Sequence, residues 1–221
     1  MKSKKLSILY EDKYIIIINK PANLLTISTE KEKERTLFHK VYEYLKNKNK
    51  NNKVFIVHRL DKDTSGIVIF AKDEKTKLYL QDNWDKFTKQ YVAVVEGKVK
   101  ESKGTLKSYL METKTHVTYS VNDKNGKLAI TEYEKVLENK KYTMLSLNLK
   151  TGRKNQIRVQ LADMGNPIVG DKKYGTKYDP IRRMALVANY LSFTHPKTKE
   201  NIEIDIDIPS EIVKLVQNDV K

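Results

Sequence analysis

The sequence has no cysteine and only four histidines, at positions 39, 58, 116 and 195. Disulfides, iron–sulfur clusters and cysteine-based zinc sites are therefore excluded, and the scattered histidines do not have the spacing of a metal site. Long apolar runs are missing too, because the run YIIII at 14–18 is far too short to span a bilayer, and Glu11 and Asp12 interrupt any signal peptide. We expect a soluble, cytoplasmic protein with no metal and no membrane partner.

Acidic residues are few compared with basic ones, 28 against 43, and the formal charge is +15. Such a charge attracts polyanions by counterion release and long-range steering, which makes nucleic acid the leading partner class. A lysine-biased composition would give the same charge without that role, since 37 of the 43 basic residues are Lys. Both explanations stay open on charge alone.

Internal repeats and Pro/Gly-rich linkers are also missing, and 221 residues with 39% hydrophobic positions can bury one substantial core, organised in one or two lobes. Helical spacing predicts helices over 36–47 and 74–87. Apolar or alternating runs predict strands within 6–21 and over 66–72, 89–99, 104–112, 115–121, 128–136, 141–149 and 200–209. The series of short strands with hairpin turns indicates an α+β protein with a mixed, mainly antiparallel sheet flanked by helices.

The stretch HRLDKDTSG, residues 58–66, places an imidazole, a guanidinium and two carboxylates between two apolar runs. An ordinary polar turn explains residues 63–66. It does not explain His58, Arg59 and Asp61, which follow an apolar strand directly, where functional groups commonly stand on a rigid support.

A second dense segment is TGRKNQIRVQLADMGNPIVGDKKYG, residues 151–175. Its apolar stripe, Gly165 and Pro167 predict a helix from about Arg153 to Met164. Five of the six arginines, at 59, 153, 158, 182 and 183, lie in or near these two segments. Arginine offers a rigid donor fork that lysine lacks, so the chain uses it where geometry matters.

The segments HRLDKDTSGIVIFAK, KQYVAVVEG and LKTGRKNQIRVQLADMGNPIVGDKKYG, with NKPAN upstream, resemble the ordered motifs of the RluA-type RNA pseudouridine synthases over about residues 6–208. The resemblance implies the pseudouridine synthase fold with a central basic active-site cleft. It also implies an isomerase of RNA modification that needs no cofactor and converts a uridine to pseudouridine in ribosomal or transfer RNA.

The resemblance also implies roles for particular residues. Asp61 matches the catalytic aspartate, which acts at the ribosyl C1′–N1 linkage either by attacking C1′ or by removing a ribose proton. Arg158 would pair with it and favour its ionised form. Tyr91 matches the tyrosine that packs on the target base, and Arg59 the arginine that fills the space of a flipped base. The RNA- and base-binding set is completed by His58, which we expect to be more structural than catalytic, Thr64, Gly152, Arg153, Asn155, Gln156 and Lys20.

Three positions depart from the family pattern: Asn23 stands where Gly is common, Asn155 where His is common and Val187 where His is frequent. Asn accepts left-handed backbone angles well, so the first change is mild. Because the first strand is expected by about Leu6, we expect one catalytic domain over 1–221, without the separate N-terminal RNA-binding domain of some relatives.

Two other functions are weaker alternatives. Asp61 and Asp63 could be the paired carboxylates of a glycosidase, which also cleaves at an anomeric carbon. A noncatalytic RNA-binding module would keep the basic surface but would not need Asp61 and Tyr91. The leading prediction is a monomeric RNA pseudouridine synthase that flips a uridine out of an RNA stem-loop, with no DNA partner.

Overall fold

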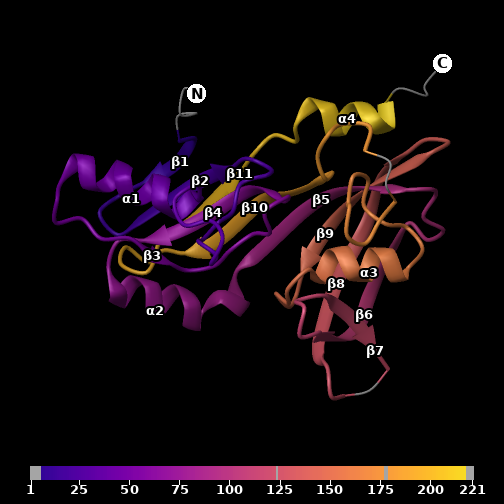
Figure 1. The fold of residues 1–221 in the computed structure, drawn as a ribbon, viewed down its shortest axis with the longest axis horizontal. Coiled ribbons are helices and arrows are strands. Elements are labelled where there is room, and N and C mark those ends of the chain that lie inside the picture. The colour runs from indigo at the N-terminus through magenta and orange to yellow at the C-terminus, as the bar shows by residue number, and fades with distance from the viewer. Residues whose placement is uncertain (1–5, 123, 177–178, 218–221) are drawn as a thin grey trace. The chain divides into compact units, whose positions relative to one another are not determined.

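The structure is a computed structural model that describes residues 6–122, 124–176 and 179–217. The chain divides into two compact units (Figure 1). The first unit contains Met1–Phe87 and Tyr190–Ile206, and the second contains Thr88–Asn189 and Asp207–Lys221. Each unit has its own strands and helices.

The sheet of the first unit has the strand order β1-β2-β4-β10, with β3 beside β4 and β11 beside β10. Its strands are β1 (Ile8–Glu11), β2 (Ile15–Lys20), β3 (Phe55–Ile56), β4 (Ser65–Ala71), the later part of β10 (Leu186–Thr194) and β11 (Asn201–Asp205). The pairs β1–β2, β2–β4, β3–β4 and β10–β11 are antiparallel. All seven residues of β4 are buried, as the dense apolar run predicts.

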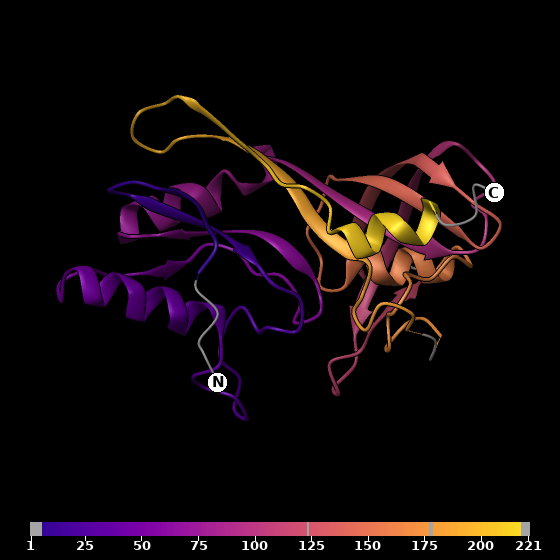
Figure 2. The same ribbon diagram turned by 90° about the horizontal axis from the view of Figure 1, so that it is seen from above.

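Helices α1 (Leu37–Lys48) and α2 (Glu74–Asp82) cover opposite faces of this sheet, as Figures 1 and 2 show. Ile15 and Ile17 of β2 share a core with Leu80 of α2. Alternate residues of a strand point the other way, and on that side the ring of Phe70 in β4 lies 6.4 Å from that of Phe38 in α1. The helices predicted over 36–47 and 74–87 are confirmed, with a short 3-10 turn at Trp84–Lys86 after α2.

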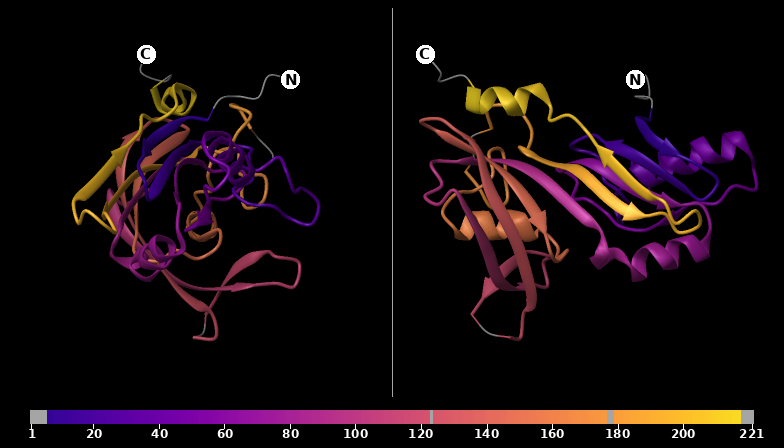
Figure 3. Two further views of the ribbon diagram at one scale, coloured as in Figure 1. Left: turned by 90° about the vertical axis from the view of Figure 1, so that its left-hand side faces the viewer. Right: turned by 180° about the vertical axis from the view of Figure 1, so that it is seen from behind.

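The second unit carries an antiparallel series of strands in the order β5-β9-β8-β6-β7 (Figure 3). They are β5 (Thr88–Glu96), β6 (Lys103–Glu112), β7 (Thr118–Val121), β8 (Lys127–Glu138) and β9 (Tyr142–Leu149), which confirms the five predicted strands. Helix α3 (Gln156–Asp163) packs its Val159 against Leu110 and Ala129. Helix α4 (Ser210–Gln217) packs against β5 and β9 and is fixed by a hydrogen bond from Asn139 Nδ2 to Leu215 O.

Several predicted boundaries differ from the structure by three residues or more, among them the ends of α2 and β5 and the start of β7. Two of the differences have a clear physical reason. Helix α3 begins at Gln156 rather than about Arg153, because Asn155 has φ 52° and ψ 19°, a left-handed conformation that no α-helix continues through. Strand β11 ends at Asp205, where its pairing with β10 ends opposite Tyr190, so the alternating isoleucines beyond it are not in the strand. The tolerance expected of Asn23 is confirmed by its φ of 63°. Among the residues that the structure describes, no helix has the length and hydropathy needed to cross a bilayer.

Candidate active site

The residues predicted to form the site come from both units. The first unit contributes Lys20, His58, Arg59, Asp61 and Thr64, and the second contributes Tyr91, Gly152, Arg153, Asn155, Gln156 and Arg158. The two sets are described in turn.

The backbone on both sides of Asp61 is held by two side chains, one at the end of β2 and one in the segment that follows it. Before Asp61, the Thr26 hydroxyl donates to Leu60 O at 2.7 Å and accepts from Leu60 N at 3.2 Å. After it, the Lys20 ammonium donates to Lys62 O at 3.1 Å. The carboxylate of Asp61, half-buried, therefore stands on a turn whose two neighbouring peptides are fixed.

Lys20 is a fully buried lysine at the end of β2. Its Nζ also donates to Pro21 O at 3.0 Å and to Leu24 O at 2.7 Å. Burying an ammonium is costly unless its donors are satisfied, so this group has a structural reason for its position. Lys20 connects the NKPAN segment to the turn that carries Asp61.

His58 is used inside the first unit. Its Nε2 accepts a hydrogen bond from Ile69 N at 3.2 Å, and its ring stacks on Trp84 with a centroid distance of 4.3 Å. Arg59, the next residue, is exposed, whereas Thr64, which directly precedes β4, is buried. The fixed ring of His58 thus holds the backbone next to Arg59, whose side chain is exposed to solvent.

The guanidinium of Arg158 is held by a two-point contact with Asp171 in the second unit. Nε donates to Oδ2 at 2.8 Å and Nη2 to Oδ1 at 2.7 Å, with both side chains buried. Nη1 donates to Asn155 Oδ1 at 3.3 Å, and the ring of Tyr174 lies 5.2 Å from the guanidinium carbon. Bidentate arginine–carboxylate pairs fix geometry as well as charge.

The surroundings of Asp171 favour the ionised form of its carboxyl group. Burial alone would raise its pKa, but the hydrogen bonds and charge of Arg158 and the N–H groups of Lys173 and Tyr174 hold the pKa below its ordinary value. The Tyr174 hydroxyl in turn accepts from Asn155 Nδ2 at 3.0 Å and from Thr118 N at 3.1 Å. Asp171 and Tyr174 therefore hold the N-terminal turn of α3.

Sequence reasoning missed Asp171, Tyr174 and Thr26 as parts of the site. The first two lie in the quoted GDKKYG run, where one acid and one aromatic ring among lysines were the available signal. Thr26 gave none, because its partner Leu60 is 34 residues away in the chain.

The predicted pocket residues at the start of α3 and just before it differ in what they contact. Gln156 is buried and bonded to β8: its Nε2 donates to Ile130 O at 3.0 Å and to Thr131 Oγ1 at 2.9 Å. Arg153 is exposed, with Nε donating to Leu128 O at 3.0 Å. Gly152 is exposed, and a Cβ placed on it would meet nothing within 4 Å. Gln156 is therefore anchored to the sheet, while Gly152 and Arg153 are open to solvent.

Tyr91 lies in β5 opposite Leu147 of β9 and is half-buried. Its ring shares a face of the strand with Ala93 and Val95, two small buried side chains. No cluster of three or more His, Asp or Glu suited to a metal ion occurs within 6–122, 124–176 and 179–217. The first unit thus offers a carboxylate on a fixed turn, and the second offers a fixed guanidinium and an aromatic ring. Such groups serve in acid–base or nucleophilic chemistry.

Comparisons with known proteins relate most of the chain to one family. Residues 14–163 match the family described as RNA pseudouridylate synthase. The uncharacterized RNA pseudouridine synthase YhcT of Bacillus subtilis is 36% identical over 215 residues, covering 96% of this chain and 71% of that protein. The ribosomal large subunit pseudouridine synthase D of Buchnera aphidicola is 33% identical over 227 residues, covering 96% and 72%.

Solved structures confirm the predicted mixed, mainly antiparallel α+β fold. Human RNA pseudouridylate synthase domain containing 1 superposes with a TM-score of 0.74 at 26% identity, over 92% of this chain and 84% of that one. Human RNA pseudouridylate synthase domain containing 4 has a TM-score of 0.78 at 22% identity, over 94% and 90%, and shows the fold alone.

Proposed function

Because the chain belongs to the family of RNA pseudouridylate synthases, we propose that it isomerises a specific uridine in a stem-loop of ribosomal or transfer RNA, with Asp61 as the catalytic carboxylate. The chain is thus an isomerase whose substrate is RNA. Its target and the roles of its residues are the proposal.

The reaction needs no oxidant, reductant or cofactor. The C1′–N1 bond of the uridine breaks, the uracil turns, and a C1′–C5 bond forms; the proton on C5 leaves to solvent and N1 gains one. Asp61 either attacks C1′ or removes a ribose proton, and both routes require the ionised carboxylate. Arg158 would favour that form by pairing with it, as the resemblance to the family implies.

The observation that carries this proposal is the fixing of the backbone on both sides of Asp61. Thr26 holds Leu60, and Lys20 holds Lys62, so the carboxylate has little freedom to lose when substrate binds. A catalytic group must be held within a fraction of an ångström of its productive position, and an ordinary surface turn does not need such support.

The other residues take different parts. Tyr91 offers a ring for stacking on the uracil and a hydroxyl for the proton at C5, and exposed Arg59 takes the space of the flipped base. Gly152 and Arg153 meet the RNA directly. Lys20, His58 and Gln156, bonded within their own units, act by positioning.

A stem-loop is the favoured target because flipping costs least where a base is already unpaired or poorly stacked. Several of the relatives are described as ribosomal large subunit pseudouridine synthase D, which makes large-subunit ribosomal RNA the first substrate to examine.

The test is release of tritium from RNA labelled at C5 of uridine. Wild-type protein and the Asp61→Asn variant are incubated with large-subunit ribosomal RNA and transfer RNA transcripts, and RNA binding is measured in parallel. Release by wild type, reduced about 1,000-fold or more in the variant with binding retained, is expected. Release undiminished by Asp61→Asn overturns the role of Asp61. Free uracil, or RNA of lower mass, indicates a glycosidase instead, since isomerisation leaves the mass unchanged.

A further inference from the structure

One end of the first unit carries three exposed lysines whose ammonium groups lie over tyrosine rings. Lys13 and Lys197 place Nζ 5.7 and 5.5 Å from the ring centre of Tyr14. Lys199 places Nζ 4.5 Å from the ring centre of Tyr79. These five residues, here called the lysine–tyrosine face, come from the β1–β2 turn, helix α2 and the β10–β11 connection.

The turns that carry this face are locked together beneath it. His195, fully buried, accepts at Nδ1 from Lys197 N and Thr198 N, and its Nε2 lies 2.9 Å from Asp12 Oδ2. Its ring packs 6.0 Å from that of Tyr14. Figure 2 shows the β10–β11 connection and the β1–β2 turn at the same end of the unit. The lysines therefore project from a rigid base.

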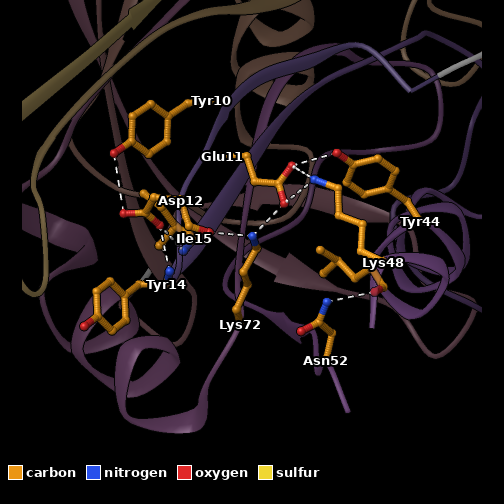
Figure 4. A network of polar contacts seen from close by, with 10 residues as sticks. Tyr10, Glu11, Asp12, Tyr14, Ile15, Tyr44, Lys48, Asn52 and Lys72 are labelled. Atoms are coloured by element: carbon orange, nitrogen blue, oxygen red, sulfur yellow. Dashed lines mark hydrogen bonds and ion pairs between the residues drawn. The ribbon is translucent and has the colours of Figure 1, made fainter. Parts of the chain in front are cut away.

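The inner carboxylates at this end accept hydrogen bonds from other groups of the protein. Glu11 accepts from Lys48, Lys72 and Tyr44 (Figure 4). Asp12 accepts from the N–H groups of Tyr14 and Ile15, and Asp73 from Thr76 at the start of α2. Within the described part of the chain, neither Lys13 nor Lys197 has a carboxylate oxygen within 4.0 Å. The exposed acids Glu74 and Glu200 lie on the same segments. The hydrogen-bonding capacity of the inner carboxylates is thus largely used within the protein, although the charge of Lys197 also acts on Asp73 and lowers its pKa. Of the three ammonium groups, that of Lys199 also donates to Pro196 O at 2.9 Å.

We propose that the lysine–tyrosine face is a second RNA contact that binds the phosphate backbone of a stem, apart from the turn that carries Asp61. Lysine is a compact charge suited to phosphate, and the rings hold its ammonium in place by cation–π attraction. Since an ammonium already lies over each ring, the face is suited to phosphates rather than to stacked bases. Such contacts position an RNA without reading its sequence.

Within the first unit, the turn of Asp61 and the lysine–tyrosine face lie at opposite ends of strand β4. The length of β4 therefore sets the distance between them. Asp61 precedes Ser65, the first residue of β4, whereas Lys72 follows the last and donates its N–H to Tyr14 O at 2.8 Å. Seven strand residues span about 20 Å. With the target loop at Asp61, as the proposed function requires, only an RNA with a stem beyond that loop reaches the face.

The experiment measures binding of two uridine-containing RNA hairpins that share one loop and have stems of about 6 and about 20 base pairs. Three proteins are compared. They are the wild type, a Gln triple variant (Lys13→Gln, Lys197→Gln and Lys199→Gln), and an Arg triple variant with Arg at the same three positions. A control triple variant, Lys98→Gln, Lys140→Gln and Lys141→Gln, removes equal charge from exposed positions of the second unit. Affinity is followed over a range of salt, with tritium release from ribosomal RNA as the activity check.

Wild type should bind the long hairpin about 10-fold more tightly than the short one, and the Gln triple variant should lose that difference while the Arg variant keeps it. The salt slope on the long hairpin should fall by about two to three. The control variant should keep the difference between the hairpins. If the face variant and the control variant lose the same affinity for the long hairpin, the effect is one of net charge alone. If the Gln variant of the face still prefers the long hairpin as wild type does, the face does not bind the stem. Either result overturns the proposal. Absence of tritium release from wild type would count against the proposed function instead.

Discussion

Arg158 and Asp171 are joined by two hydrogen bonds, Nε to Oδ2 at 2.8 Å and Nη2 to Oδ1 at 2.7 Å, in the interior of the second unit. They are 13 residues apart in the chain, on helix α3 and on the segment after Gly170. The pair fixes the direction of a guanidinium that the proposed mechanism needs, so Asp171 is a positioning residue for Arg158.

Asp171→Asn should lower the free energy of unfolding by about 2–4 kcal/mol at neutral pH, because it removes the charged half of a buried two-point ion pair. The pKa of Asp171 is depressed in the folded protein, so its stabilisation is present above about pH 4 and is lost as the pH falls through that lowered pKa. The difference between wild type and variant, measured by urea unfolding, should therefore shrink in acid. Glu32→Gln, at an exposed pair with Arg35, is the control and should change little.

Glu11→Gln should remove an acid-sensitive part of the stability of the first unit. Although burial raises the pKa of Glu11, hydrogen bonds from Lys72, Lys48 and Tyr44 lower it to about 2 from 4.5 (Figure 4). The stabilisation is complete above pH 4.5 and disappears as the pH falls toward 2. We expect the variant to lose about 1–2 kcal/mol at pH 7 and to show a flatter acid limb in thermal unfolding. An acid limb as steep as that of wild type would contradict this account.

Gly152→Ala should leave stability within about 0.5 kcal/mol of wild type, because the new methyl group meets nothing within 4 Å. If RNA approaches this backbone closely, tritium release should fall about 10-fold through a higher KM. Gly170→Ala is the contrasting variant: its Cβ would lie 2.2 Å from Arg183 O at a φ of 75°, so it should unfold more easily. Equal kinetics for Gly152→Ala and wild type would remove Gly152 from the RNA contact.

Lys20→Met should destabilise the protein by about 1–3 kcal/mol, since it leaves three partly buried carbonyl acceptors without the ammonium that donates to them. In the fraction that stays folded, kcat should fall more than RNA affinity, because the turn of Asp61 loses its support. Lys62→Met is matched to it: only the backbone oxygen of Lys62 takes part, so stability should be nearly unchanged. A Lys20→Met enzyme with normal kcat would show that the turn is held well enough by Thr26.

Most of the architecture could be predicted from local patterns. The apolar runs of β2 and β4 and the capping threonine before α1 each determine their own element, because the signal lies within a few residues. The start of α3 could not, because Asn155 adopts its left-handed angles in contact with Arg158 and Tyr174, and no local pattern encodes those contacts.

The site was only partly predictable for a similar reason. Asp61 and Arg158 stood out as charged groups next to apolar runs. Their supports, Thr26 and Asp171, depend on chain segments that fold back from a distance, and a small hydroxyl or one acid among many gives no signal by itself. A sequence motif identifies the reactive residues. It does not identify the residues that hold them in position.

The buried ammonium of Lys20 has a consequence for how the first unit opens. Residues 20–26 and 58–66 are distant in the chain, yet Lys20 and Thr26 join them by hydrogen bonds to backbone groups at Lys62 and Leu60. Neither segment can therefore fray alone, and both should exchange amide hydrogens as one cooperative unit with β2 and β4. The Leu60 amide should be among the slowest to exchange in any turn of the protein, so the reactive turn, unlike most active-site loops, belongs to the stable part of the molecule.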